Sequence, residues 1–232
     1  MPTAGTVRTS LHTPVVRVTA AAVALALALF ALPACGTPPT KAENRLASTA
    51  FPVDLAPNLT RRVYSPRTES SADVYLTDLS PQALTRALSD PADPTTGTIV
   101  HVHLFIRPQP GRTPIEETAL SATIRYVILA RGQAGVYDGG GFLLPEGKPG
   151  GDRFEGTMLD ASVRLSAATP GFIDRIGRGS LELDFRAERD EPASELIRRV
   201  ADRFAFRAIQ TSRETDTPDD LPGDTTDDPQ GE

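Results

Sequence analysis

A period of two in the apolar residues constrains the fold of this chain more than any other feature. From Ser180 to Ala187 every second side chain is apolar, and the side chains between them are polar or charged. Ala72–Asp78 and Phe154–Ala167 repeat this alternation. Because successive side chains of a strand point to opposite faces, each segment is predicted to be a strand with one buried face.

Two further strands are predicted between these segments. Thr98–Arg107 is apolar on both faces, which predicts a strand in the middle of a sheet. Ala119–Ala130 is a second long strand, and Arg131–Ala134 predicts a hairpin turn into another strand that begins at Gly135. The short connections, with no strand–helix–strand rhythm, predict a mainly β fold: a single antiparallel sheet or a β-sandwich.

Two segments have the pattern of helices instead. Ser80 suits a helix N-cap and Pro81 the first helical position, so a short helix is expected near 80–89. A C-terminal helix is expected near 192–204, where apolar residues recur at helical spacing: Leu196, Ile197, Val200, Ala201 and Phe204. Residues 204–206 also fit a strand, which leaves the end of this helix open.

Residues 1–34 are predicted to be a signal peptide. Arg8 and Arg17 precede fifteen uncharged residues from Val18 to Leu32, and Pro33 follows at once. A membrane-spanning helix needs about 20 apolar residues. A positive start followed by a shorter apolar run is typical of a secretory signal.

The signal segment ends in Leu32-Pro33-Ala34-Cys35-Gly36, which resembles the lipobox of bacterial lipoproteins. The resemblance implies cleavage before Cys35, a diacylglycerol thioether on its sulfur and a further acyl chain on its freed amine. The membrane would then be a partner through the lipid, since each buried CH₂ contributes about 0.8 kcal/mol. Gly36 in place of Asp implies the outer membrane in a cell with two membranes. The alternative is cleavage after Gly36, which would discard Cys35 and release a soluble secreted protein.

Composition divides the mature chain into three parts. Residues 35–71, the lipidated cysteine and a stretch rich in Pro, Thr, Ser and Ala, are predicted to form a flexible tether. Its later part, Phe51–Tyr64, has scattered apolar residues, and the alternative there is packing on the domain. Residues 72–210 are predicted to form the globular β-rich domain. Residues 211–232 carry eight acidic side chains against Arg213 alone, so this acidic tail is predicted to be disordered.

Charge and cysteine content exclude several classes of function. The net charge is −6 and the middle of the chain is nearly neutral, so nucleic acid, which needs a basic face, is not an expected partner. A single cysteine excludes an internal disulfide and a zinc site built on several thiolates. Of the 24 basic residues 22 are arginine, which we attribute to a GC-rich genome and not to an arginine-based site.

His101 and His103 are the candidate metal ligands. Their spacing places both imidazoles on one face of a strand, about 7 Å apart along the chain. A metal site would need a third ligand, such as a carboxylate from a neighbouring strand. The alternative is that both rings pack beside Ile99 and Phe105. No cofactor is expected.

The glycine run Gly139–Gly141 is a second candidate feature. Glycines let a ligand approach the backbone, but this run does not match a dinucleotide or phosphate-loop fingerprint. We expect it to break the preceding strand in a bulge or tight bend.

Nucleophilic hydrolysis is not expected, because both histidines of the mature chain lie on one strand and no nucleophile elbow occurs. The function expected is that of a lipid-anchored envelope protein whose domain is a binding or scaffolding module, with a protein of the envelope as a possible partner. One alternative is a metal-binding protein or an enzyme with His101, His103 and Asp138 in its site. Another is a soluble secreted β protein.

Overall fold

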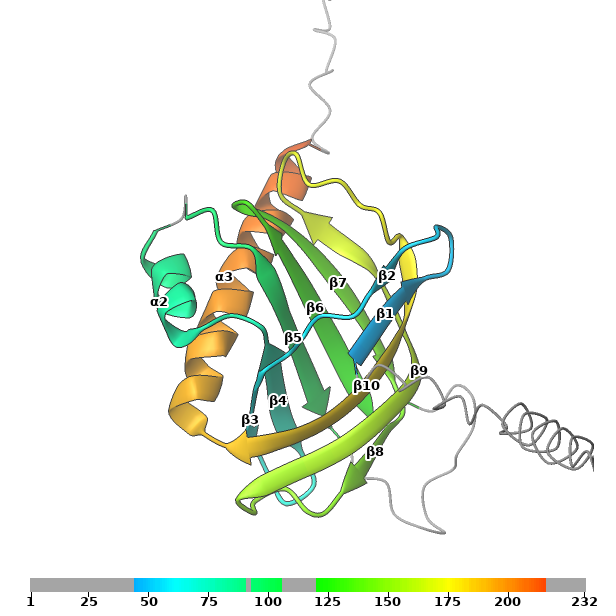
Figure 1. The fold of residues 1–232 in the computed structure, drawn as a ribbon, viewed down its shortest axis with the longest axis vertical. Helices are drawn as coiled ribbons and strands as arrows, with labels where there is room; N and C mark the ends of the chain where they lie inside the picture. Colours follow the sequence, from blue (N-terminus) through cyan, green and yellow to red (C-terminus); the bar gives the residue numbers. More distant parts are fainter. Residues whose placement is uncertain (1–43, 91–92, 106–119, 216–232) are drawn as a thin grey trace, which may run out of the picture. The chain divides into compact units, whose positions relative to one another are not determined.

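The structure is a computed structural model that describes residues 44–90, 93–105 and 120–215, all within a unit that spans Ala42–Glu232. These residues form ten strands and two helices (Figure 1). In chain order the elements are β1 (Asn44–Ser48), β2 (Asp54–Leu55), β3 (Arg61–Pro66), β4 (Ala72–Thr77), α2 (Pro81–Ser89), β5 (Gly97–Leu104), β6 (Ala122–Ala130), β7 (Gln133–Gly141), β8 (Leu143–Glu146), β9 (Arg153–Ala168), β10 (Arg178–Arg189) and α3 (Glu191–Thr215).

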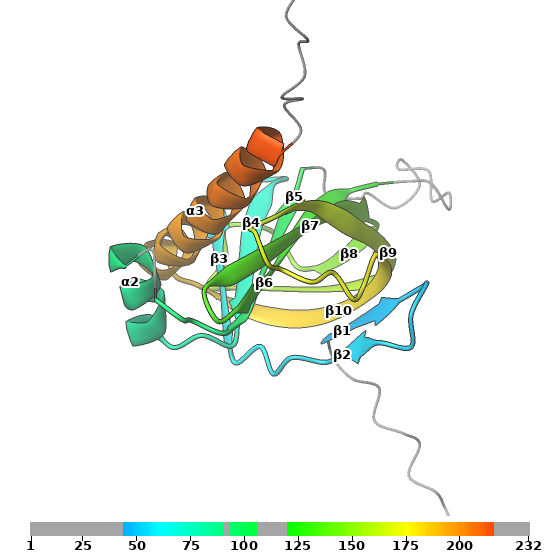
Figure 2. The ribbon, with the colours of Figure 1, turned by 90° about the horizontal axis from the view of Figure 1, so that it is seen from above.

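The strands form one sheet that closes on itself. Its order is β2-β1-β10-β3-β4-β5-β6-β7-β9-β8, and an additional pairing of β9 with β10 closes the ring. Viewed from above, both helices lie outside the ring on one side, and β1 and β2 lie outside it on another (Figure 2). The prediction of a mainly β fold with one sheet, a short helix and a C-terminal helix is confirmed. The sheet is mixed, because β10 runs parallel to β3 while its other pairings are antiparallel.

The alternation of side chains builds a core on each side of the sheet. Val74 of β4 and Val102 of β5 point into the ring, where they are fully buried together with Tyr64, Phe154 and Phe185. Their neighbours on the opposite face, such as Tyr75 and Ile99, are buried in a second core under α3. This double burial explains why β5 is apolar on both faces, and β5 lies in the middle of the sheet as predicted.

Both helices begin where their caps predict. The Ser80 hydroxyl accepts a hydrogen bond from the amide of Ala83 at 3.2 Å, and Pro81 is the first residue of α2. At α3 the carboxylate of Asp190 accepts from the amide of Ala193 at 2.9 Å. Each cap satisfies an amide that has no partner inside its helix.

The helix α3 is longer than predicted. It continues through residues 204–206, which also fitted a strand, to Thr215, and so includes the first residues of the predicted disordered tail. Small buried residues, Ala205 and Ala208, let the helix stay close to Val136 and Ala167 of the sheet. Neither of the two helices in the described residues is long and apolar enough to cross a membrane.

The predicted tether is wrong from residue 44 onward, because its second part contains β1, β2 and β3. The strand β3 is part of the closed ring, and Tyr64 on it is fully buried. One partner of β3, the strand β10, is distant in the sequence. The Pro and Ser content of the segment also conceals the alternation that would predict a strand. The signal peptide, Cys35 and the acidic tail after Thr215 lie outside the described residues.

The glycine run does not break its strand, contrary to the prediction. The strand β7 continues to Gly141, and Gly139 lies opposite Val163 of β9 in a close backbone approach. A Cβ atom on Gly139 would lie 1.9 Å from the carbonyl oxygen of Ser162, well inside van der Waals contact. The absence of a side chain at Gly139 is therefore what allows β7 and β9 to pair here.

We predict that Gly139→Ala lowers the free energy of unfolding by about 3 kcal/mol, because backbone atoms of β9 must move to admit the methyl group. Urea unfolding of the purified chain measures this. Gly151→Ala is the matched control, since its nearest neighbour would be 3.6 Å away. Equal stability of the two variants would contradict the close approach.

Candidate functional site

Two neighbouring rows of side chains cross the outer face of the sheet where β4, β5, β6, β7, β9 and β10 lie side by side. Residues two apart on a strand share a face, and the register of the strands aligns them across the sheet. The first row is Tyr75, His101, Arg125, Asp138, Arg164 and Arg178. The second row is Asp73, His103, Thr123, Gly140, Ser162 and Ser180. We call these twelve residues the polar band.

The carboxylate of Asp73 organises one end of the polar band. Its Oδ1 atom lies 2.9 Å from Nε2 of His101 and 2.8 Å from Nδ1 of His103. Its Oδ2 atom accepts a hydrogen bond from Nε of Arg67. Only 3% of the Asp73 side chain is exposed, whereas 38% of His103 is. The structure thus confirms that the two histidines share a face and shows that they meet on one buried carboxylate.

The charge on Asp73 fixes which nitrogen of each imidazole carries a proton. Burial alone would raise the pKa of Asp73, but the hydrogen bonds from His101, Arg67 and His103 outweigh burial and hold the pKa well below its usual range. An ionised carboxylate only accepts, so each bonded ring nitrogen carries a proton. In a neutral ring the other nitrogen, Nδ1 of His101 or Nε2 of His103, is an acceptor.

Tyr75 supports this arrangement from the side covered by α3. Its ring stacks on His101 with centroids 4.5 Å apart and planes 9° apart. Burial and the nearby charge of Asp73 raise the pKa of the Tyr75 phenol, so it stays neutral. The stacking restricts rotation of the His101 ring, and the imidazole is held by contacts on its edge and on its face.

The middle of the polar band contains an ion pair. Nε of Arg125 lies 2.9 Å from Oδ1 of Asp138, and the hydroxyl of Ser166 donates to Oδ2 at 2.7 Å. The site predicted from sequence placed Asp138 with the two histidines. Asp138 does line the same cavity as they do, but its carboxylate binds Arg125 and not an imidazole.

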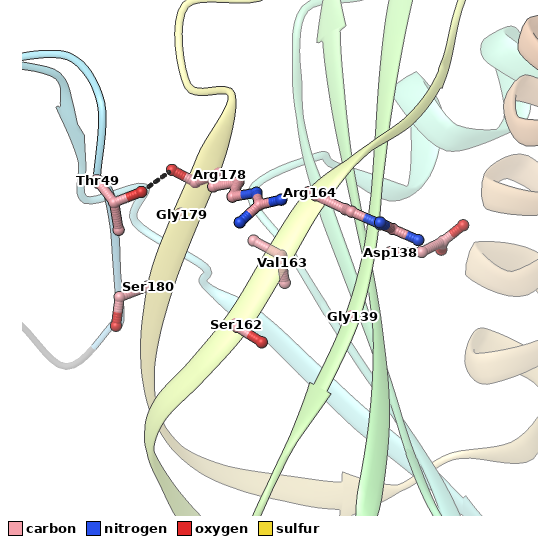
Figure 3. A pocket seen from close by; sticks show the side chains of 9 residues that line it. All are labelled: Thr49, Asp138, Gly139, Ser162, Val163, Arg164, Arg178, Gly179 and Ser180. Carbon is pink, nitrogen blue, oxygen red and sulfur yellow. Dashed lines mark hydrogen bonds between the residues drawn. The ribbon is translucent and has the colours of Figure 1, made fainter. Parts of the chain in front are cut away.

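Two adjoining cavities open along the polar band. One of about 520 Å³ is lined by both histidines, Arg67 and Arg125. The other, of about 490 Å³, is lined by Arg164, Arg178 and the hydroxyl residues Thr49, Ser162 and Ser180 (Figure 3). Asp138 and Gly139 line both cavities, so the two cavities adjoin at the middle of the polar band.

The described residues contain no group of three or more His, Cys, Asp or Glu side chains placed to hold a metal ion. His101 and His103 each use one ring nitrogen on Asp73, and their ring centroids are 6.5 Å apart. Metal binding by this pair stays a prediction. A carboxylate that orients an imidazole is also the usual outer partner of a metal-bound histidine.

Comparison with known proteins adds no assignment: no family model matches this chain, and no curated protein or solved structure is significantly similar to it.

Sequence reasoning found the two histidines and Asp138 but missed Asp73, Arg67 and the arginines of the first row. Asp73 lies on the polar face of the alternating segment Ala72–Asp78, and nothing in that pattern marks it as a partner of the histidines. The arginines were attributed to genome composition. Their common face depends on the register of strands that lie far apart in the sequence, and period-two patterns do not specify that register.

We predict that Asp73→Asn lowers the free energy of unfolding by about 3 kcal/mol at neutral pH, because it leaves the Arg67 and histidine donors without their charged acceptor. Chemical denaturation measures the loss. The control is Asp54→Asn, which removes an exposed ion pair with Arg45 and should cost less than about 1 kcal/mol. Equal costs would contradict the central role of Asp73.

The lowered pKa of Asp73 also predicts that the stability of the wild type and of Asp73→Asn depends differently on pH. The pKa of Asp73 is lower in the folded protein than the value of about 3.9 for an unfolded aspartate. Its stabilisation is therefore complete above about pH 4 and is lost as the pH falls toward the folded pKa. Asp73→Asn should lose less stability than the wild type between about pH 4 and pH 2. If the free energy of unfolding changed with pH in the same way in both proteins, the ionised Asp73 would not contribute to stability.

Proposed function

We propose that this chain is a lipid-anchored protein of the bacterial cell envelope whose domain binds a small polar ligand along the polar band. One observation carries the binding role: a buried, ionised Asp73 orients two imidazoles at the edge of a 520 Å³ cavity. Burying a charge is costly, and apolar residues would serve the stability of the sheet at least as well. Convergent polar groups around a hollow are typical of ligand sites.

The polar band offers a ligand both acceptors and donors. In their neutral forms His101 and His103 each offer a second ring nitrogen as an acceptor, while the guanidinium of Arg125 donates hydrogen bonds. A hydroxyl-bearing or carboxylated small molecule would complement this set. The sheet positions these groups rigidly, because each projects from the middle of a hydrogen-bonded strand.

The anchor is supported by the lipobox-like segment Leu32–Gly36 and by the position of the first strand. The strand β1 begins at Asn44, nine residues after Cys35. Nine residues reach at most about 30 Å when fully extended. A lipid on Cys35 would therefore keep the domain near the membrane surface, the outer membrane in a cell that has two.

The lipid anchor predicts that Cys35 carries the acyl chains. A radioactive fatty acid fed to expressing cells should label the wild type and not Cys35→Ser, because the thioether forms on this sulfur alone. Mass spectrometry of the amino terminus gives the second readout. An unmodified terminus at Thr37 would establish instead the alternative of a soluble protein cleaved after Gly36.

The binding role predicts where ligands perturb the protein. Glucose, gluconate and glutamate, each at millimolar concentration, are titrated into the ¹⁵N-labelled mature chain with Cys35→Ser. At least one probe should shift amide resonances around Asp73, His103 and Arg125, and His103→Ala should abolish those shifts. Shifts confined to other faces, or none with any probe, would contradict the proposal.

The alternative function is a metal-binding protein or an enzyme that uses His101 and His103. It is favoured by the carboxylate that orients both rings. Zn²⁺ in the same titration distinguishes it: saturable shifts at both imidazoles with one ion per chain would favour the metal site over the small-molecule site.

A further inference from the structure

Arg164 and Arg178 form an unusual pair at the far end of the polar band. They are direct partners in the register of β9 and β10. Like charges directly opposite on one face of a sheet destabilise it. Farther along the same two strands, Arg186 lies opposite Glu155 and forms an ion pair at 2.9 Å. The two strands thus match opposite charges at one end and place two arginines at directly opposite positions at the other.

Neither guanidinium of this pair is neutralised within the part of the chain that the structure describes. Arg45, Arg125 and Arg186 each have a carboxylate within 3 Å, whereas Arg164 and Arg178 form no ion pair with a described residue. Figure 3 shows Arg178 reaching from β10 toward β9, and Arg164 reaching across β7 toward Asp138. The oxygens of Asp138 already bind Arg125 and Ser166, so its charge is shared.

Hydroxyl groups complete the surroundings of the pair. Ser162 and Ser180 are register partners in the next row and line the same 490 Å³ cavity. Neither hydroxyl forms a hydrogen bond within the described residues. The cavity therefore combines two unpaired guanidinium groups with two hydroxyl donors. This set of donors calls for a ligand with negative charge and several acceptor oxygens.

We propose that Arg164, Arg178, Ser162 and Ser180 bind a phosphate group, a subsite that deepens the ligand-binding role proposed above and rests on it. Guanidinium groups donate two parallel hydrogen bonds to phosphate or carboxylate oxygens. A phosphate fits better than a carboxylate, because two guanidinium charges balance a dianion and four donors need more than two oxygens. The phosphate belongs either to a soluble phosphate ester or to a lipid headgroup near the membrane.

Calorimetric titration of the mature chain with Cys35→Ser at low salt tests this subsite. Glycerol 3-phosphate is the probe, and glycerol is the uncharged control. Saturable binding is expected for the phosphate ester alone. Arg164→Gln and Arg178→Gln should each weaken it by about tenfold or more, because each removes charge-assisted hydrogen bonds. Arg186→Gln is the matched control and should change the dissociation constant less than twofold.

A stability readout separates loss of binding from loss of folding. Arg178→Gln removes the repulsion with Arg164, so its melting temperature in phosphate-free buffer should equal or exceed that of the wild type. Inorganic phosphate should raise the melting temperature of the wild type and not that of the variant. A variant that melts earlier and still binds the probe would overturn the proposal.

Vesicles distinguish the two sources of the phosphate. Phosphatidylglycerol in phosphatidylcholine vesicles is compared with phosphatidylcholine alone, using wild type and Arg178→Gln. Binding of glycerol 3-phosphate identifies a soluble ester as sufficient, and arginine-dependent binding of the anionic vesicles alone identifies a headgroup. Failure of both, or equal weakening by Arg186→Gln, overturns the subsite. Shifts at the Asp73 end with uncharged or carboxylated probes would leave the broader binding role intact.

Discussion

The pairing of β9 with β10 is the constraint on which the rest of this structure depends. It closes the sheet into a ring and brings Phe154 and Phe185 together in the interior. It also extends the transverse rows from β7 to β10, so that His101 and Arg178 belong to one continuous row on the outer face. The ring is possible because Gly139 has no side chain where β7 meets β9. One backbone approach therefore supports both the core and the site.

The outer face has two environments, and α3 divides them. The apolar face of α3 packs on Ile99, Val127 and their neighbours. Ile99 and Val127 are as fully buried as the residues inside the ring. Where α3 does not cover the sheet, the outer face of β4, β5, β6 and β7 presents the residues of the polar band. The boundary is at Tyr75, which packs under α3 and stacks on His101. A helix that covered the whole face would have required apolar residues at Arg125 and Asp138, and the two cavities would not be open.

Local pattern was enough to predict the long strands, α2 and the central position of β5, because period-two alternation and helix caps depend on neighbours in the sequence. It failed for β3, whose partner β10 lies more than a hundred residues away and runs parallel to it. It failed again at Gly139, where a break in the strand was expected. Pairing with β9 keeps the backbone of β7 extended there. The candidate site was half predicted for the same reason. His101 and His103 are two residues apart, whereas Asp73 and Arg164 join them only through register between strands.

The proposed anchor and the proposed phosphate subsite are linked through β1. This strand follows the short connection from Cys35 and pairs with β10 from Gly179 to Leu183. Just after β1, the hydroxyl of Thr49 donates to the carbonyl of Arg178 at 3.0 Å. The first described strand after Cys35 therefore also borders the arginine pair, whereas Asp73 lies at the other end of the polar band. In a lipid-anchored chain, the arginine end of the polar band would therefore border the first described strand after the anchor. A ligand with one phosphate and a polar body would then lie with its anionic end toward β1 and its neutral end toward the histidines.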